Sequence, residues 1–273
     1  MNSKIKSFIE KIIPARYLEF FNSNVIILTK RPNQGHVISD LFLMRIEDDW
    51  ETFFECIQIN KILNPIKDPQ NNSVKIYFHN SQGEFIGEKT LSLNEDHKIT
   101  LNINEIANEI GINRDATFTL FHSNNTKWLS EFNSFTGDRG YTGYYNLKKG
   151  SIKSFIHGNL DAISYSNNKI KLLGNYSFTY KNYIVQHLFD SNFIYELFWV
   201  NSTNSKQKFT IIEIKASGEK STSFIINPKG ILKFIKKIDE ARLNSQIIIK
   251  SKLYLARPMI FKIMPDSFDV FHG

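Results

Sequence analysis

The stretch FTIIEIKASGEKSTSFIINPKGILKFI, residues 209–235, decides the fold class predicted for this chain. It contains three short apolar segments, separated by a turn signal at Ser217-Gly218-Glu219 and a second turn centred on Asn227. Runs rich in Ile, Phe and Thr between such turns are typical of β-strands. Strands at this spacing, with little helix between them, predict an antiparallel sandwich or barrel.

The same order of segments occurs earlier in the chain. VKIYFHNSQGEFIGEKTLSLNEDHKITLNI, residues 74–103, also reads strand, Gly-Glu turn, strand, Asn-centred turn and strand. Each stretch follows a further apolar strand, FFECIQIN at 53–60 and YELFWVN at 195–201. The sequence therefore predicts one structural unit that is written twice.

The ends of the two units also correspond. The segments SFIHG, residues 154–158, and FDVFHG, residues 268–273, are both rich in aromatic residues and both end on His-Gly. Arg139 and Arg257 precede them at similar places, and the first unit is longer because of an insertion between its last strands.

We therefore predict an all-β fold of two tandem related antiparallel β-sandwich domains, preceded by a short amphipathic helix. The expected boundaries are 1–22 for the helical segment, 23–160 for the first sandwich with an inserted loop at 123–145, and 161–273 for the second. Within residues 3–13, apolar side chains at Ile5, Phe8, Ile9, Ile12 and Ile13 fall on one helical face. That helix is expected either to cover the sheet or to dock on a protein partner or an anionic membrane surface.

Composition narrows the classes of function. The net charge of +7 favours anionic partners, but the lysines are scattered and no zinc pattern or arginine patch occurs, so a nucleic-acid partner is not expected. The single cysteine, Cys56, cannot form an intramolecular disulfide. No run of about 18 apolar residues is present, and no signal peptide is recognised, so a cytoplasmic location is expected.

Each unit resembles the small β-sandwich of the sensory rhodopsin transducer family. The resemblance is one of pattern, and WVNSTNSKQKFTIIEIKASGEKSTSFIINPKGILKFIKKI with SKLYLARPMIF carries it, while residues 56–122 repeat it more weakly. It covers about 70 residues per unit, and it implies a sandwich that serves interaction or small-ligand binding. The tandem arrangement departs from the single-domain pattern of that family.

The richest candidate site is SEFNSFTGDRGYTGYY, residues 130–145. Asp138 and Arg139 offer charge, Tyr141 and Tyr144 offer faces on which a sugar can stack, and the glycines permit close backbone approach. His157, Arg257 and His272 complete the ligand-binding residues that we predict. No metal site and no cofactor are expected, because no tight histidine spacing and no nucleotide-binding motif is present.

Two classes of function follow from these residues. The first is a non-catalytic binding or interaction protein that recognises a polar or anionic small ligand, such as a sugar, at the inserted loop or between the domains. The alternative is an enzyme acting on a glycan or sugar-nucleotide precursor, with His157 and Asp138 as catalytic residues and Arg139 holding the anion.

Overall fold

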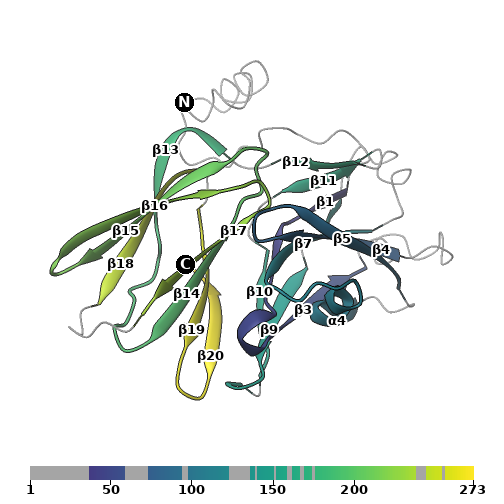
Figure 1. Ribbon diagram of the computed structural model, residues 1–273, viewed down its shortest axis with the longest axis horizontal. Coiled ribbons are helices and arrows are strands. Elements are labelled where there is room, and N and C mark those ends of the chain that lie inside the picture. Colours follow the sequence, from purple (N-terminus) through teal and green to yellow (C-terminus); the bar gives the residue numbers. More distant parts are fainter. Residues whose placement is uncertain are drawn as a thin grey trace, which may run out of the picture.

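The computed structural model describes residues 37–58, 73–93, 98–122, 136–138, 140–150, 152–158, 162–166, 169–173, 176–237, 244–253 and 256–273 (Figure 1). The described chain is nearly all β, as predicted, and its one α-helix is α4 (Ile103–Asn108). The expected helix at 3–13 lies outside these residues. No helix among the described residues is long and apolar enough to cross a membrane.

Two four-stranded antiparallel sheets form the first half of the chain, with a hydrophobic core between them. Their orders are β2-β7-β4-β5 and β10-β9-β3-β6. The strands are β2 (Phe42–Met44), β3 (Trp50–Ile57), β4 (Ser73–Asn80), β5 (Phe85–Ser92), β6 (Lys98–Asn102), β7 (Ala116–His122), β9 (Tyr141–Asn146) and β10 (Ser154–His157). A short 3-10 helix, η1 (Glu47–Asp49), precedes β3.

The second half of the chain repeats this construction with sheets ordered β13-β18-β15-β16 and β17-β14-β19-β20. A second core cluster fills the space between them. The strands are β13 (Tyr176–Ile184), β14 (Ile194–Val200), β15 (Gln207–Lys215), β16 (Gly218–Ile226), β17 (Ile231–Lys236), β18 (Ser245–Leu253), β19 (Met259–Ile263) and β20 (Phe268–His272).

The strand orders of the two halves correspond one to one. The strand β2 matches β13, and the strands β3 to β7 match β14 to β18 in turn. With β9 and β10 matched to β19 and β20, the sheets of the two halves have the same strand orders. The hairpins also agree, because Gly83 in the β4–β5 turn has φ +83° and Gly218 at the β15–β16 turn has φ +131°. Glycine is favoured at both positions because a Cβ disfavours positive φ.

A fifth sheet, ordered β12-β11-β1-β8, departs from the predicted domain boundaries. It consists of β1 (Val37–Ser39), β8 (Thr136–Asp138), β11 (Ile163–Ser166) and β12 (Lys169–Leu172). We expected residues 161–173 to begin the second sandwich, but β11 pairs with β1. The expected loop at 123–145 also contains strands, because β9 pairs with both β3 and β10 inside the first half.

The two halves lie side by side (Figure 1). An apolar cluster of side chains from both halves packs between them. Alternation in β14 sends Tyr195, Leu197 and Trp199 into the core of the second half and leaves Phe198 facing the first half. The cluster contains Leu43, Trp50, Tyr144, Ile156, Phe198, Met259, Phe261 and Val270. The outer face of the sheet β17-β14-β19-β20 is thereby covered.

A buried arginine, Arg45, crosses the same interface. The Arg45 side chain is fully buried, and its guanidinium lies 4.6 Å from the centre of the Phe198 ring, with the rings of Trp50 and Phe261 at 5.0 and 4.8 Å. Its Nε lies 3.1 Å from Asp115 Oδ2. Aromatic faces and a carboxylate together compensate the charge for the loss of water.

Candidate functional site

Two of the predicted site residues meet at the edge where the halves touch. His157 ends β10 and His272 ends β20, and their ring centroids lie 5.0 Å apart. His272 Nε2 lies 2.8 Å from the carbonyl oxygen of His157. The repeated His-Gly motif therefore brings two histidines together, one from each half.

Arg257 belongs to the same neighbourhood. Burial, together with the charges of Arg257 and His157, lowers the pKa of His272 to about 4, so this imidazole is neutral at physiological pH. The hydroxyl of Tyr183 donates a hydrogen bond to the carbonyl oxygen of Gly273. Burial raises the pKa of Tyr183, and the charge of Arg257 offsets part of this rise. The Tyr183 contact lies within the second half and ties its last residue to β13.

The two candidate tyrosines of β9 face opposite ways. Tyr141 is 45% exposed and pairs with His157 in the β9–β10 ladder, so it lies beside the histidines. Tyr144 is fully buried, and its hydroxyl donates to the carbonyl oxygen of Leu43, 2.8 Å away. Burial raises the pKa of Tyr144. The period of two in a strand explains the difference, and Tyr144 is a core residue and not a ligand-binding one.

Asp138 and Arg139 are the other two ligand-binding residues predicted in this segment. Asp138 lies in β8, where its backbone pairs with Ser39. This places Asp138 and His157 in different sheets. Arg139 lies outside the described residues. In the sequence it precedes β9 by two residues, as Arg257 precedes β19.

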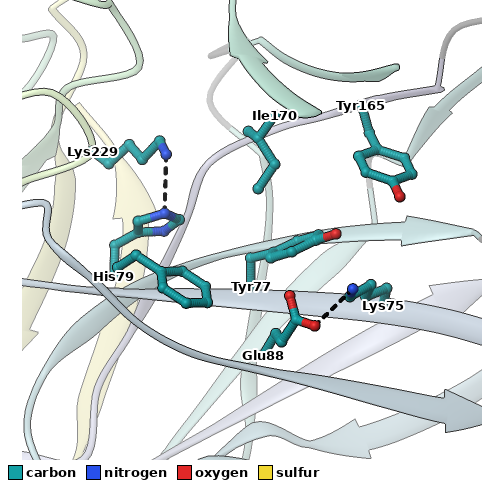
Figure 2. A pocket seen from close by; sticks show the side chains of 8 residues that line it. Lys75, Tyr77, His79, Glu88, Tyr165, Ile170 and Lys229 are labelled. Atoms are coloured by element: carbon teal, nitrogen blue, oxygen red, sulfur yellow. Dashed lines mark hydrogen bonds and ion pairs between the residues drawn. The ribbon is translucent and has the colours of Figure 1, made fainter. Parts of the chain in front are cut away.

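The structure also contains a cavity that the sequence did not predict, with a volume of about 590 Å³ (Figure 2). It lies between one face of β4 and β5, the β11–β12 hairpin and the β16–β17 turn. Small-molecule sites typically have volumes of about 300–1,000 Å³. The residues that line it are Lys75, Tyr77, His79, Phe85, Glu88, Tyr165, Ile170 and Lys229.

The pattern of β4 explains why these side chains gather there. In VKIYFH, residues 74–79, Val74, Ile76 and Phe78 are buried in the first core. The alternate residues must point to the other face. This second face, which carries Lys75, Tyr77 and His79, would be solvated in an isolated sandwich. Here the β11–β12 hairpin and the β16–β17 turn cover it.

At one end of the cavity, a lysine of the second half contacts a histidine of the first half. Lys229 Nζ lies 3.0 Å from His79 Nε2. Burial and the charge of Lys229 lower the pKa of His79 to about 3, so His79 is neutral and accepts a hydrogen bond from the ammonium group. Burial also lowers the pKa of Lys229. His79 Nδ1 is buried and has no hydrogen-bond partner among the described residues.

The backbone of Lys229 is strained. Its φ is +62°, in the left-handed region that residues with a Cβ seldom adopt. The conformation is fixed by hydrogen bonds from Lys229 N to Asn201 O, 2.6 Å, and from Thr117 Oγ1 to Lys229 O, 2.8 Å. Strained residues that neighbouring contacts hold in place occur often at functional sites.

The other end of the cavity carries an ion pair. Lys75 Nζ lies 2.7 Å from Glu88 Oε1, and both side chains are partly exposed. Hydrogen bonding to Glu88 raises the pKa of Lys75 and keeps it charged. Between the two ends lies the ring of Tyr77, with Ile170 and Tyr165 across from it (Figure 2). The cavity thus has two polar ends and an aromatic middle.

Sequence reasoning missed this cavity although part of its signal was present. The alternation of VKIYFH places a lysine, a tyrosine and a histidine on one strand face. The contributions of Tyr165, Ile170 and Lys229 depend on packing between segments that lie far apart along the chain, which no local pattern encodes.

No grouping of three His, Cys, Asp or Glu side chains suited to a metal ion is present within the described ranges.

No model of a known protein family and no curated protein sequence matches the chain. Among solved structures, the major pilin of Streptococcus pyogenes is similar over 86% of this chain and 83% of the pilin, with 9% identity and a TM-score of 0.18. An anti-sigma factor domain-containing protein is similar over 84% of this chain and 80% of its own, with 10% identity and a TM-score of 0.17. A beta-glucuronidase of glycoside hydrolase family 2 is similar over 86% of this chain but only 23% of its own, with 7% identity and a TM-score of 0.13. Scores this low say nothing about function.

Proposed function

We propose that the protein is a non-catalytic binding protein, built from two tandem related β-sandwiches, that recognises a small polar or anionic ligand in the cavity between its halves. The matching strand orders support the duplication. The proposal includes a cytoplasmic location, in which the buried Cys56 thiol stays reduced.

One observation carries the binding proposal. Lys229 is a lysine in a strained conformation, and it extends into a cavity where burial works against its charge. A lysine in such a place lowers stability twice, through its backbone and through its desolvated ammonium group. An anionic ligand would offset the second effect. The rings of Tyr77, Phe85 and Tyr165 beside it suit a sugar, whose apolar face stacks on aromatic rings.

The paired histidines support this reading less strongly. The contact between His272 Nε2 and the carbonyl oxygen of His157 uses one imidazole nitrogen within the protein. The cavity instead offers an open volume with polar groups at both ends. The enzymatic alternative needs Asp138 to act with His157, and these residues lie in different sheets.

Titration calorimetry with neutral and acidic monosaccharides, acetate and inorganic phosphate tests the proposal. Phe85 lines the cavity and is 57% exposed, so Phe85→Ala removes a ring without disturbing the core. We expect at least one compound to bind, and Phe85→Ala to weaken it about three- to tenfold, as the loss of one aromatic contact predicts.

Phe155→Ala is the matched control, because Phe155 is 41% exposed on β10 and does not line the cavity. It should leave the affinity unchanged. If no compound binds, or if the two variants weaken binding equally, the cavity is not the site.

A further inference from the structure

The two ends of the cavity differ in net charge. At one end the ammonium of Lys75 is neutralised by Glu88. At the other end His79 is held neutral, and Lys229 contributes a positive charge. Among the described side chains that line the cavity, the balance is therefore one positive charge, located at Lys229.

A single charge favours a monoanion. A carboxylate needs one cation and a few hydrogen bonds, and the three donors of a lysine can supply both. A phosphate dianion would keep one uncompensated negative charge inside a cavity that also contains the Glu88 carboxylate. The cavity also lacks an arginine, the side chain best suited to phosphate, among its described lining residues.

The rest of the cavity favours a ring that carries hydroxyl groups. Tyr77 and Phe85 come from neighbouring strands, and their ring centroids lie 6.4 Å apart with the ring planes tilted by 52°, so a sugar ring can stack on one of them and touch the other. Ile170 lies across from Tyr77 (Figure 2). The Lys75–Glu88 pair offers donors and acceptors side by side, which a hydroxyl group can use at the same time.

Resting on the binding function proposed above, we infer that the ligand is a sugar acid: a hydroxylated ring with a single carboxylate. The carboxylate contacts Lys229 Nζ, an apolar ring face lies on Phe85 and touches Tyr77, and hydroxyl groups bond to Lys75 and Glu88. This orientation satisfies both polar ends, and reversal would place the carboxylate against Glu88.

The test compares matched sugars by titration calorimetry at pH 7. The probes are glucuronate and galacturonate, their neutral counterparts glucose and galactose, and glucose 6-phosphate. We expect at least one uronate to bind about tenfold more tightly or better than its neutral counterpart, as a charged hydrogen bond predicts. It should also bind more tightly than glucose 6-phosphate.

Lys229→Met locates the charge that gives this preference. The substitution keeps a side chain of similar length, and the two backbone hydrogen bonds of the residue remain. We expect uronate binding to fall to the level of the neutral sugar, with the neutral sugar unaffected. Lys220→Met, at an exposed lysine of β16 outside the cavity, should preserve the preference. Urea unfolding shows whether each variant is folded.

The outcomes separate this inference from the function on which it rests. Equal binding of uronate and neutral sugar, tighter binding of glucose 6-phosphate, or an unchanged preference in folded Lys229→Met would overturn the sugar acid and leave a binding cavity. Binding of none of the five sugars overturns the inference, while acetate or phosphate binding would still preserve an anion site.

Discussion

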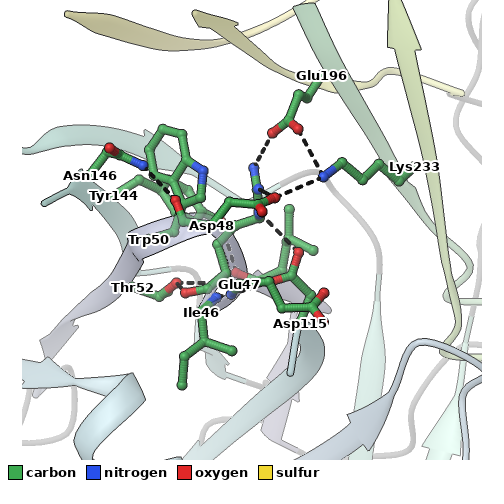
Figure 3. Close-up of polar contacts among 12 residues, drawn as sticks. Ile46, Glu47, Asp48, Trp50, Thr52, Asp115, Tyr144, Asn146, Glu196 and Lys233 are labelled. Atoms are coloured by element: carbon green, nitrogen blue, oxygen red, sulfur yellow. Dashed lines mark hydrogen bonds and ion pairs between the residues drawn. The ribbon is translucent and has the colours of Figure 1, made fainter. Parts of the chain in front are cut away.

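Arg45 Nη1 lies 2.7 Å from Glu196 Oε2, and this ion pair joins the first half of the chain to the second. The carboxylate of Glu196 also accepts a bond from Lys233 Nζ, 2.8 Å away (Figure 3). The carboxylate of Asp115 accepts a hydrogen bond from Arg45 Nε. It also accepts bonds from the backbone N–H groups of Ile46 and Glu47. The interface between the halves is thus organised around one buried guanidinium.

Arg45→Met should therefore destabilise the protein by about 3–5 kcal/mol, because it removes the Arg45 cation from the largely buried carboxylate of Asp115 and leaves Glu196 with Lys233 alone. Urea unfolding measures this loss. Lys98→Met is the control: it removes the partly exposed pair with Glu55, and such pairs contribute about 0–1 kcal/mol. Equal costs for the two variants would show that Arg45 does not organise the interface.

A second contact between the halves depends on a glycine. A Cβ on Gly83 would lie 1.8 Å from the carbonyl oxygen of Pro228, in the turn that carries Lys229. Gly111 has a similar φ, +78° against +83°, but a Cβ there would meet nothing within 4 Å. Gly111→Ala should therefore cost only the backbone strain, about 1–2 kcal/mol.

Gly83→Ala should cost the same strain plus about 1–3 kcal/mol for the clash. It should also weaken ligand binding, because the β16–β17 turn must shift. Chemical unfolding of both variants, with calorimetric titration of any sugar that binds, checks the pair. Similar stability of the two variants would mean that the turns of the two halves do not press together.

The burial of His79 predicts a dependence of stability on pH. Its pKa is about 3 in the folded protein, against 6.5 for an unperturbed histidine, the value expected in the unfolded chain. The unfolded state therefore takes up a proton below pH 6.5 that the folded state refuses, and stability falls as the pH drops from 6.5 towards 3. Between pH 7.5 and 5 this amounts to roughly 2 kcal/mol.

His79→Gln removes this titration, so its free energy of unfolding should fall less between about pH 7.5 and 5 than that of the unsubstituted protein. His272, with a pKa of about 4, contributes in the same direction and is present in both proteins. The difference between the two slopes isolates His79. Parallel slopes would indicate that His79 is not buried beside Lys229 in solution.

The local patterns of the chain were enough to predict many of the strands, although β11 and β12 lie where no strand was expected. The alternation in VKIYFH and the Gly-Glu turns at Gly83 and Gly218 are local signals, and they lie in β4, β4–β5 and β15–β16 as expected. The repeated His-Gly motif was also informative, because His157 and His272 end corresponding strands.

Local sequence patterns did not predict which distant segments pair or pack together. The predicted boundary placed residues 161–173 at the start of the second sandwich, whereas β11 within them pairs with β1, which lies far earlier in the chain. Tyr144 looked like a ligand-binding residue because sequence composition does not say which face of β9 a side chain takes. Lys229 was missed because neither its φ nor its contact with His79 can be read from Asn-Pro-Lys-Gly alone.

The strain at Lys229 predicts opposite effects of one substitution on stability and binding. Lys229→Gly relieves the positive φ, which costs about 1–2 kcal/mol for a residue with a Cβ, and part of this gain is offset because glycine loses more entropy on folding. It also removes a partly buried ammonium group. We expect the free energy of unfolding to rise by about 1 kcal/mol, while uronate binding falls to the level of the neutral sugar.

Lys229→Met separates the two effects, because it removes the charge and keeps the strained backbone. It should lose the uronate preference without the gain that comes from relief of the φ angle. Chemical unfolding and calorimetric titration of both variants and the unsubstituted protein decide the matter. If Lys229→Gly is less stable than Lys229→Met, the backbone is not strained at this position. If Lys229→Gly gains stability and loses the uronate preference, the chain keeps an unfavourable residue there because its ammonium group serves the ligand.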